Sequence, residues 1–145
     1  MSEDPRAILL VEDNADDAEL TIRGLKRANL QNPIDVASDG QDALDYLFDE
    51  DNEMPRLVLL DLRLPSTDGL EVLKRIRAHE RTALTPVVIL TSSSAPTDVD
   101  AGYRYGANSY VRKPINYDQF ASLIRQVGSY WLVINEPPSG NQDPR

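Results

Sequence analysis

The chain alternates between short apolar runs and longer segments in which apolar residues recur at helical spacing. Continuous runs of four or five apolar residues are typical of strands that are buried on both faces of a sheet. Residues 7–11, 57–60 and 86–90 are runs of this kind. We interpret the less apolar segments 33–37 and 109–111 as two further short strands.

Each expected strand is followed by a segment with apolar residues three or four positions apart, which is the period of a helix face. The clearest face lies near the C-terminus and comprises Phe120, Leu123, Ile124, Val127 and Trp131. The weakest lies in residues 97–106, where Gly102 disfavours a helix. Five strands alternating with five helices predict an α/β fold, a doubly wound five-stranded parallel sheet with helices on both faces.

The length of 145 residues fits one domain. We expect residues 1–6 to be an N-terminal extension, residues 7–130 to form the domain, and residues 131–145 to form a C-terminal arm and flexible tail. Residues 136–145 are rich in proline and polar side chains, as is typical of a flexible segment.

The composition narrows the classes of function. The net charge of −9 argues against binding a nucleic-acid backbone by bulk charge. The absence of cysteine excludes disulfides and thiol catalysis, and the single histidine, His79, excludes a His-rich metal site. No apolar run approaches the ~20 residues that span a bilayer, and the N-terminus lacks the apolar core of a signal peptide. We therefore expect a cytoplasmic protein that binds neither nucleic acid nor membrane.

Polar side chains stand where the expected strands end. Glu12 and Asp13 follow the first strand, Asp61 the third, Thr91 the fourth and Lys113 the fifth. The carboxyl ends of parallel strands share one edge of the sheet, where folds of this type place their sites. Carboxylates that lie close together repel one another, and a hard divalent cation such as Mg²⁺ or Mn²⁺ relieves that repulsion.

Asp61 has the features of a nucleophile toward phosphorus. The apolar strand that runs directly into Asp61 places its carboxylate at the floor of a pocket, as aspartyl-phosphate chemistry requires. Lys113 and the Thr91 hydroxyl are suited to the charge on the oxygens of a transferred phosphoryl group. The plainer alternatives are that Thr91 caps a helix and that Lys113 is a solvated surface lysine.

Five motifs contain or adjoin these residues: E-D-N at 12–14, L-L-D-L-R-L-P at 59–65, D-G at 68–69, L-T-S at 90–92 and Y-V-R-K-P at 110–114. In this order and spacing they resemble the receiver domain of two-component response regulators. The resemblance covers residues 7–128 and makes the expected domain a receiver. It implies a receiver or flavodoxin-like fold and phosphorylation of Asp61 by a sensor histidine kinase.

The resemblance also implies a metal site. Its ligands would be Asp13, Asp61 and the main-chain carbonyl of Arg63, with Glu12 acting directly or through water, around Mg²⁺ or Mn²⁺. In receivers, two side chains tune dephosphorylation. One stands two positions after the phosphorylated aspartate, here Asp61, and the other stands two positions after the residue that matches Thr91. Here these side chains are Arg63 and Ser93.

The resemblance implies three further features. Lys113 would pair with the phosphoryl group, and Thr91 and Tyr110 would act as the switch pair. The peptide bond between Lys113 and Pro114 would be cis. The plainer interpretation of Tyr110 is a core aromatic residue.

Three segments make the resemblance more specific. They are V-E-D-N-A-D-D at 11–17, the acidic stretch at 49–53 and F-A-S-L-I-R-Q-V-G-S-Y-W-L-V-I at 120–134. These segments are similar to single-domain regulators that serve bacterial and cyanobacterial phytochromes, and no effector domain is recognisable after the receiver. This implies a bacteriophytochrome as the kinase and an output through protein–protein contacts, with a downstream phosphotransfer protein as one such partner.

Other functions remain open on the sequence. A Mg²⁺-dependent aspartate-nucleophile phosphatase would use the same carboxylates, but it needs a second acid where Arg63 stands and a cap domain. A flavodoxin-like cofactor binder needs a phosphate loop after the first strand, where Glu12 and Asp13 stand. His79 as a phosphorylated histidine is disfavoured, since it lies late in the third expected helix, away from the strand ends.

Residues 131–134 are four consecutive apolar residues at the end of the last expected helix. One helix face cannot bury all four, so the run either leaves the helix as an extended arm or stays partly exposed. Exposed apolar surface usually marks an interface. We predict a two-fold homodimer through the fifth helix and this segment, with exchange of arms as a variant. The alternative is that the segment folds back on its own domain.

Overall fold

The structure is a computed structural model that describes residues 4–28 and 30–139. Within these residues the sheet has five parallel strands in the order β2-β1-β3-β4-β5. The strands are β1 (Ile8–Val11), β2 (Ile34–Ala37), β3 (Leu57–Leu60), β4 (Val87–Thr91) and β5 (Ser109–Arg112). The predicted fold class is therefore confirmed, and the strand order reverses direction beside β1, as in doubly wound sheets.

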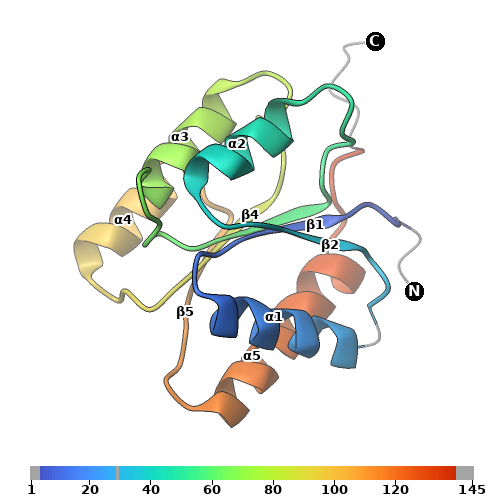
Figure 1. The fold of residues 1–145 in the computed structure, drawn as a ribbon, viewed down its shortest axis with the longest axis vertical. Coiled ribbons are helices and arrows are strands. Elements are labelled where there is room, and N and C mark those ends of the chain that lie inside the picture. Colours follow the sequence, from blue (N-terminus) through green and yellow to red (C-terminus); the bar gives the residue numbers. More distant parts are fainter. Residues whose placement is uncertain (1–3, 29, 140–145) are drawn as a thin grey trace.

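Helices cover both faces of the sheet (Figure 1), with α2, α3 and α4 on one side and α1 and α5 on the other. Their bounds are α1 (Ala15–Arg27), α2 (Gly40–Phe48), α3 (Gly69–Ala78), α4 (Pro96–Arg104) and α5 (Tyr117–Ser129). Four begin at an Asn or Asp whose side chain accepts a hydrogen bond from a main-chain amide of the first turn. The weakly patterned fourth segment is also helical; it begins with Pro96, which suits the first position of a helix, although no side chain caps it.

The core lies in two layers, one on each face of the sheet. Leu9 and Val11 of β1 pack into the layer under α2 and α3, whereas Ile8 and Leu10 pack into the layer under α1 and α5. Both faces are buried, and this explains why the central strands are continuously apolar rather than alternating. Burial of one such side chain stabilises the fold by ~1.5–3 kcal/mol.

The apolar run at the end of α5 stays helical. It forms one π-helical segment, η1 (Tyr130–Ile134), so the run does not leave the helix as an extended arm. Leu132 is fully buried in the layer with α1 and α5. Part of the run stays exposed instead, because Tyr130, Val133 and Ile134 are 47%, 46% and 67% exposed.

The segment after η1 lies against the segment before β1. Arg6 pairs with Asp4 and donates a hydrogen bond of 2.9 Å to the main-chain oxygen of Pro138. Residues 140–145, the end of the expected flexible tail, lie outside the described residues. The domain boundaries at residues 7 and 130 stay a prediction. Of the helices in the described chain, none has the length and apolar character that crossing a bilayer requires.

Candidate functional site

The predicted polar residues meet at the carboxyl edge of the sheet. The side chains of Glu12, Asp13 and Asp61 each offer a carboxylate oxygen, and these three atoms lie within 4.8 Å of one another. Glu12 and Asp61 are buried, whereas Asp13 is exposed. A cluster of hard oxygen ligands that is open on one side fits Mg²⁺ or Mn²⁺, which keep several waters when bound. Three of the predicted ligands therefore lie together, and the full ligand set, which also includes the main-chain carbonyl of Arg63, stays a prediction.

Asp61 is held by contacts from three directions. Its Oδ1 accepts hydrogen bonds from the Thr91 hydroxyl at 2.9 Å and from the Arg63 amide at 3.0 Å, and its Oδ2 accepts one from the Lys113 ammonium at 2.9 Å. Burial alone would raise the pKa of Asp61, but the donors and the positive charge of Lys113 hold it below the ordinary value. Asp61 is therefore an ionised carboxylate at neutral pH, as a nucleophile must be.

Lys113 carries the positive charge of the site. Its ammonium also donates to Glu12 Oε1 and, at 3.1 Å, to Asp17 Oδ2. Burial would lower the pKa of Lys113, but Glu12 and Asp61 raise it above the ordinary value, so the ammonium stays protonated. Burial raises the pKa of Glu12 to about 7 against the opposing effect of Lys113. Since Lys113 is also buried, it is not a solvated surface lysine.

Asp17 is the member of this group that the sequence analysis missed. It stands in the first turn of α1, where an acid favours the helix N-terminus. That local role accounts for its presence without any contact to the site. The signal that could have found it is its place one helical turn beyond Asp13, on the turn of α1 next to the acidic cluster.

Thr91 and Tyr110 lie on neighbouring strands, but their side chains have different partners. The Thr91 hydroxyl is buried against Asp61, whereas the half-buried Tyr110 donates a hydrogen bond of 2.9 Å to the main-chain oxygen of Ser93. The Ser93 hydroxyl donates to Asp98 of α4 at 2.5 Å. Tyr110 is therefore connected to α4 through Ser93. This connection has no signal in the sequence.

The remaining predicted positions are placed as follows. The Arg63 side chain is exposed and lines an open polar hollow of about 400 Å³ with Asp68 and Asp98. His79 stacks on Phe48, with ring centroids 4.5 Å apart. The peptide bonds of the described chain are all trans, so the expectation of a cis bond before Pro114 is wrong. An X–Pro bond prefers trans by ~0.5–1 kcal/mol.

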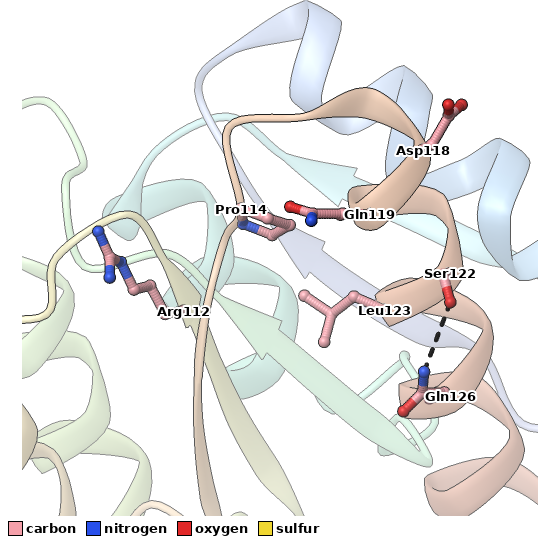
Figure 2. Close-up of a pocket in the computed structure, with 7 residues that line it drawn as sticks. All are labelled: Arg112, Pro114, Asp118, Gln119, Ser122, Leu123 and Gln126. Atoms are coloured by element: carbon pink, nitrogen blue, oxygen red, sulfur yellow. Dashed lines mark hydrogen bonds between the residues drawn. The ribbon is translucent and has the colours of Figure 1, made fainter.

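A second hollow of about 450 Å³ lies between the end of β5 and α5 (Figure 2). The residues lining it are Arg112, Pro114, Asp118, Gln119, Ser122, Leu123 and Gln126. The predicted phosphoacceptor, metal-ligand and switch residues are absent from this lining. The hollow is therefore a feature of the α5 surface rather than part of the acidic site.

The fold and the site together define a receiver domain, and the comparison with known families agrees. Residues 8–125 match the model of the response regulator receiver domain. The chain therefore belongs to the response regulator receiver family. Receiver domains accept phosphoryl groups from histidine kinases and bind Mg²⁺ or Mn²⁺ at an acidic pocket.

Two relatives match nearly the whole chain. The probable methanogenesis regulatory protein FilR2 of Methanothrix harundinacea is 41% identical over 94% of this chain and 90% of its own length. The response regulator Rcp1 of Synechocystis sp. is 36% identical over 90% of this chain and 92% of its own length.

Solved structures show the same architecture. The Mn²⁺-bound form of Rcp1 superposes with a TM-score of 0.89 at 34% identity, over 93% of this chain and 100% of that one. The phosphorylated form of the cyanobacterial phytochrome response regulator RcpA has a TM-score of 0.88 at 32% identity, over 94% and 100% of the two chains. The bacteriophytochrome response regulator RtBRR has a TM-score of 0.71 at 44% identity, over 93% and 85%.

Proposed function

We propose that this protein is a single-domain response regulator that accepts a phosphoryl group on Asp61 from a histidine kinase and signals through phosphorylation-dependent protein contacts. One observation carries the proposal. The buried Asp61 carboxylate is bound at once by the Lys113 ammonium, the Thr91 hydroxyl and the Arg63 amide, and it adjoins two further carboxylates.

The chemistry follows from these contacts. An Asp61 oxygen forms a bond to phosphorus while the phosphorus–nitrogen bond to the kinase histidine breaks. Lys113 and Thr91 already contact Asp61, so they are placed to bind the oxygens of the group that Asp61 receives. Glu12, Asp13, Asp61 and the Arg63 carbonyl would hold Mg²⁺ or Mn²⁺, which supplies positive charge beside those oxygens.

The activity proposed for the chain itself is limited to this transfer and to its own dephosphorylation. A phosphatase of the aspartate-nucleophile kind needs an acid where the exposed Arg63 stands. Sustained hydrolysis of a phosphate ester by the wild type, lost in Asp61→Asn, would favour the phosphatase instead.

A bacteriophytochrome is the kinase that we propose. The likeness to RcpA and RtBRR supports it, whereas the likeness to FilR2 points to a kinase with another input. The proposal is tested by offering the protein equal amounts of each phosphorylated kinase from its source. The cognate kinase transfers within seconds and the others transfer far more slowly, as expected for a difference in docking affinity. A phosphotransfer protein would compete for the phosphoryl group downstream.

A homodimer through α5 and η1 is the proposed assembly. Tyr130, Val133 and Ile134 are exposed large apolar or aromatic side chains on one short segment, and such surface favours association. The neighbouring Trp131 packs edge-to-face on Tyr130 with centroids 5.1 Å apart, so the segment has a defined shape.

The decisive experiment is labelling by a phosphorylated kinase. The wild type should acquire an acid-labile, hydroxylamine-sensitive phosphoryl group, and Asp61→Asn should acquire none. Asp100→Asn removes an exposed carboxylate from α4 and serves as the control for charge and folding. Equal labelling of the wild type and Asp61→Asn would refute the assignment.

A further inference from the structure

A fourth carboxylate takes part in the site, although it is outside the acidic cluster. Asp17 of α1 accepts a hydrogen bond of 3.1 Å from the Lys113 ammonium. Its side chain is 34% exposed, whereas that of Lys113 is 7% exposed. Asp17 therefore reaches the buried ammonium from the solvent side of the site.

The three contacts of Lys113 use all of its donors. An ammonium has three N–H groups and no acceptor, and among the described residues its acceptors are Glu12, Asp17 and Asp61. When each takes one N–H, rotation about the terminal bond is fixed. A lysine side chain is flexible on its own, so these contacts decide where its third N–H points.

Asp17 differs from the other two acceptors because it has no other proposed role in the site. Oxygens of Glu12 and Asp61 belong to the acidic cluster that fits a divalent cation, and Asp61 is also the proposed phosphoacceptor. Asp17 belongs to neither. It is therefore the acceptor that can hold Lys113 throughout the reaction, while the other carboxylates change partners.

We propose that Asp17 is a positioning residue for phosphoryl transfer, which anchors the Lys113 ammonium so that one N–H is directed at Asp61. The inference rests on the proposed function, because it assigns Asp17 a part in the same reaction. Asp17 acts through Lys113 and does not touch the reacting atoms. Its effect should appear in the rate of transfer rather than in the binding of the donor.

The test uses acetyl phosphate with Mg²⁺, so that docking of a kinase has no influence. In this reaction Asp61 forms the new bond to phosphorus and acetate leaves. Asp17→Ala should lower the maximal rate of phosphorylation about tenfold at an unchanged half-saturating concentration, less than the ~10²-fold that a misplacement of about 1 Å can cost. Asp17→Asn keeps an acceptor oxygen and should restore most of the rate.

Asp16→Ala is the matched control. Asp16 shares the first turn of α1 and the same charge, but it is exposed and is not one of the three acceptors of Lys113. It should leave the rate unchanged. A normal or faster rate for Asp17→Ala, or equal losses in both alanine variants, would overturn the inference. Absence of labelling in the wild type would instead refute the proposed function.

Discussion

The Thr91 hydroxyl donates a hydrogen bond of 2.9 Å to Oδ1 of Asp61, and both residues are buried. A hydroxyl already directed at the carboxylate needs little movement to reach an oxygen of a group bound there. We expect the larger rearrangement in the loop between β4 and α4. There the Tyr110 hydroxyl donates to the Ser93 carbonyl, and the Ser93 hydroxyl donates to Asp98. Two packings of this loop, biased by one added charge, would constitute the switch.

Thr91→Ala should separate phosphorylation from the response. Lys113 and the Arg63 amide still contact Asp61 in this variant, so labelling should persist. Amide chemical shifts of α4 and β5 should move much less on phosphorylation than in the wild type. Ser92→Ala, an exposed neighbour, is the control. Shifts confined to α1 in the wild type would contradict this account of switching.

Removal of the divalent cation should stop phosphorylation, because repulsion among the carboxylates and the incoming group is then not neutralised. Asp13→Ala should weaken Mg²⁺ binding by more than the ~10–100-fold that loss of an outer hydrogen-bond partner costs a metal site. Its thermal stability in chelator should not fall, since Asp13 is exposed and its loss relieves repulsion. Titration of Mg²⁺ followed by NMR measures the affinity. Wild-type affinity in Asp13→Ala would remove Asp13 from the ligand set.

Gly69→Ala should displace the main chain next to Asp61 and so disturb the site. A Cβ at Gly69 would lie 2.5 Å from the main-chain oxygen of Asp61 and 2.6 Å from the Cα of Leu62, so the backbone has to shift. We expect a loss of ~1–3 kcal/mol in the free energy of unfolding and slower phosphorylation. Gly128→Ala is the comparison, because its Cβ would meet flexible ends of leucine side chains. It should leave phosphorylation unchanged. Chemical denaturation and acetyl phosphate labelling measure the two effects.

Substitutions in η1 should affect either the stability of the fold or the assembly of the protein, depending on whether the side chain is buried or exposed. Leu132→Ala should lower the free energy of unfolding by ~2–5 kcal/mol, because Leu132 is fully buried. Val133→Asp and Ile134→Asp should leave the free energy of unfolding nearly unchanged and should weaken the proposed dimer, since both side chains are exposed. These variants are sharper than truncation before Tyr130, which also removes Leu132. Sedimentation of the wild type as a monomer at high concentration would refute the dimer.

The strand ends were predictable because β1, β3 and β4 are short apolar runs that end in polar residues, and Lys113 follows the next expected strand. Parallel strands bring such ends to one edge, so Asp13, Asp61 and Lys113 could be grouped before any contact was known. Asp17 could not, since a first-turn acid has a sufficient local reason. The contact depends on how α1 is placed over the sheet edge.

Two other features were also beyond the sequence. The link from Tyr110 to Asp98 runs through a main-chain oxygen of Ser93, and every residue has such an oxygen. In the π-helical turn at Tyr130–Ile134, Leu132 is buried in the core and Trp131 packs against it, while Tyr130, Val133 and Ile134 are exposed. The apolar run indicated only that some of these side chains would stay exposed.

The hydrogen bond from Arg6 to Pro138 brings two distant parts of the chain side by side. A short linker across this contact would make the polypeptide a closed ring, which could be opened elsewhere. Opening between the exposed residues Glu50 and Asp51 leaves every strand and helix intact. Synthesis would then begin with β3, the strand that leads into Asp61, and β1 would be made only after β5. The covalent order of the strands can thus be exchanged without changing which strands are neighbours.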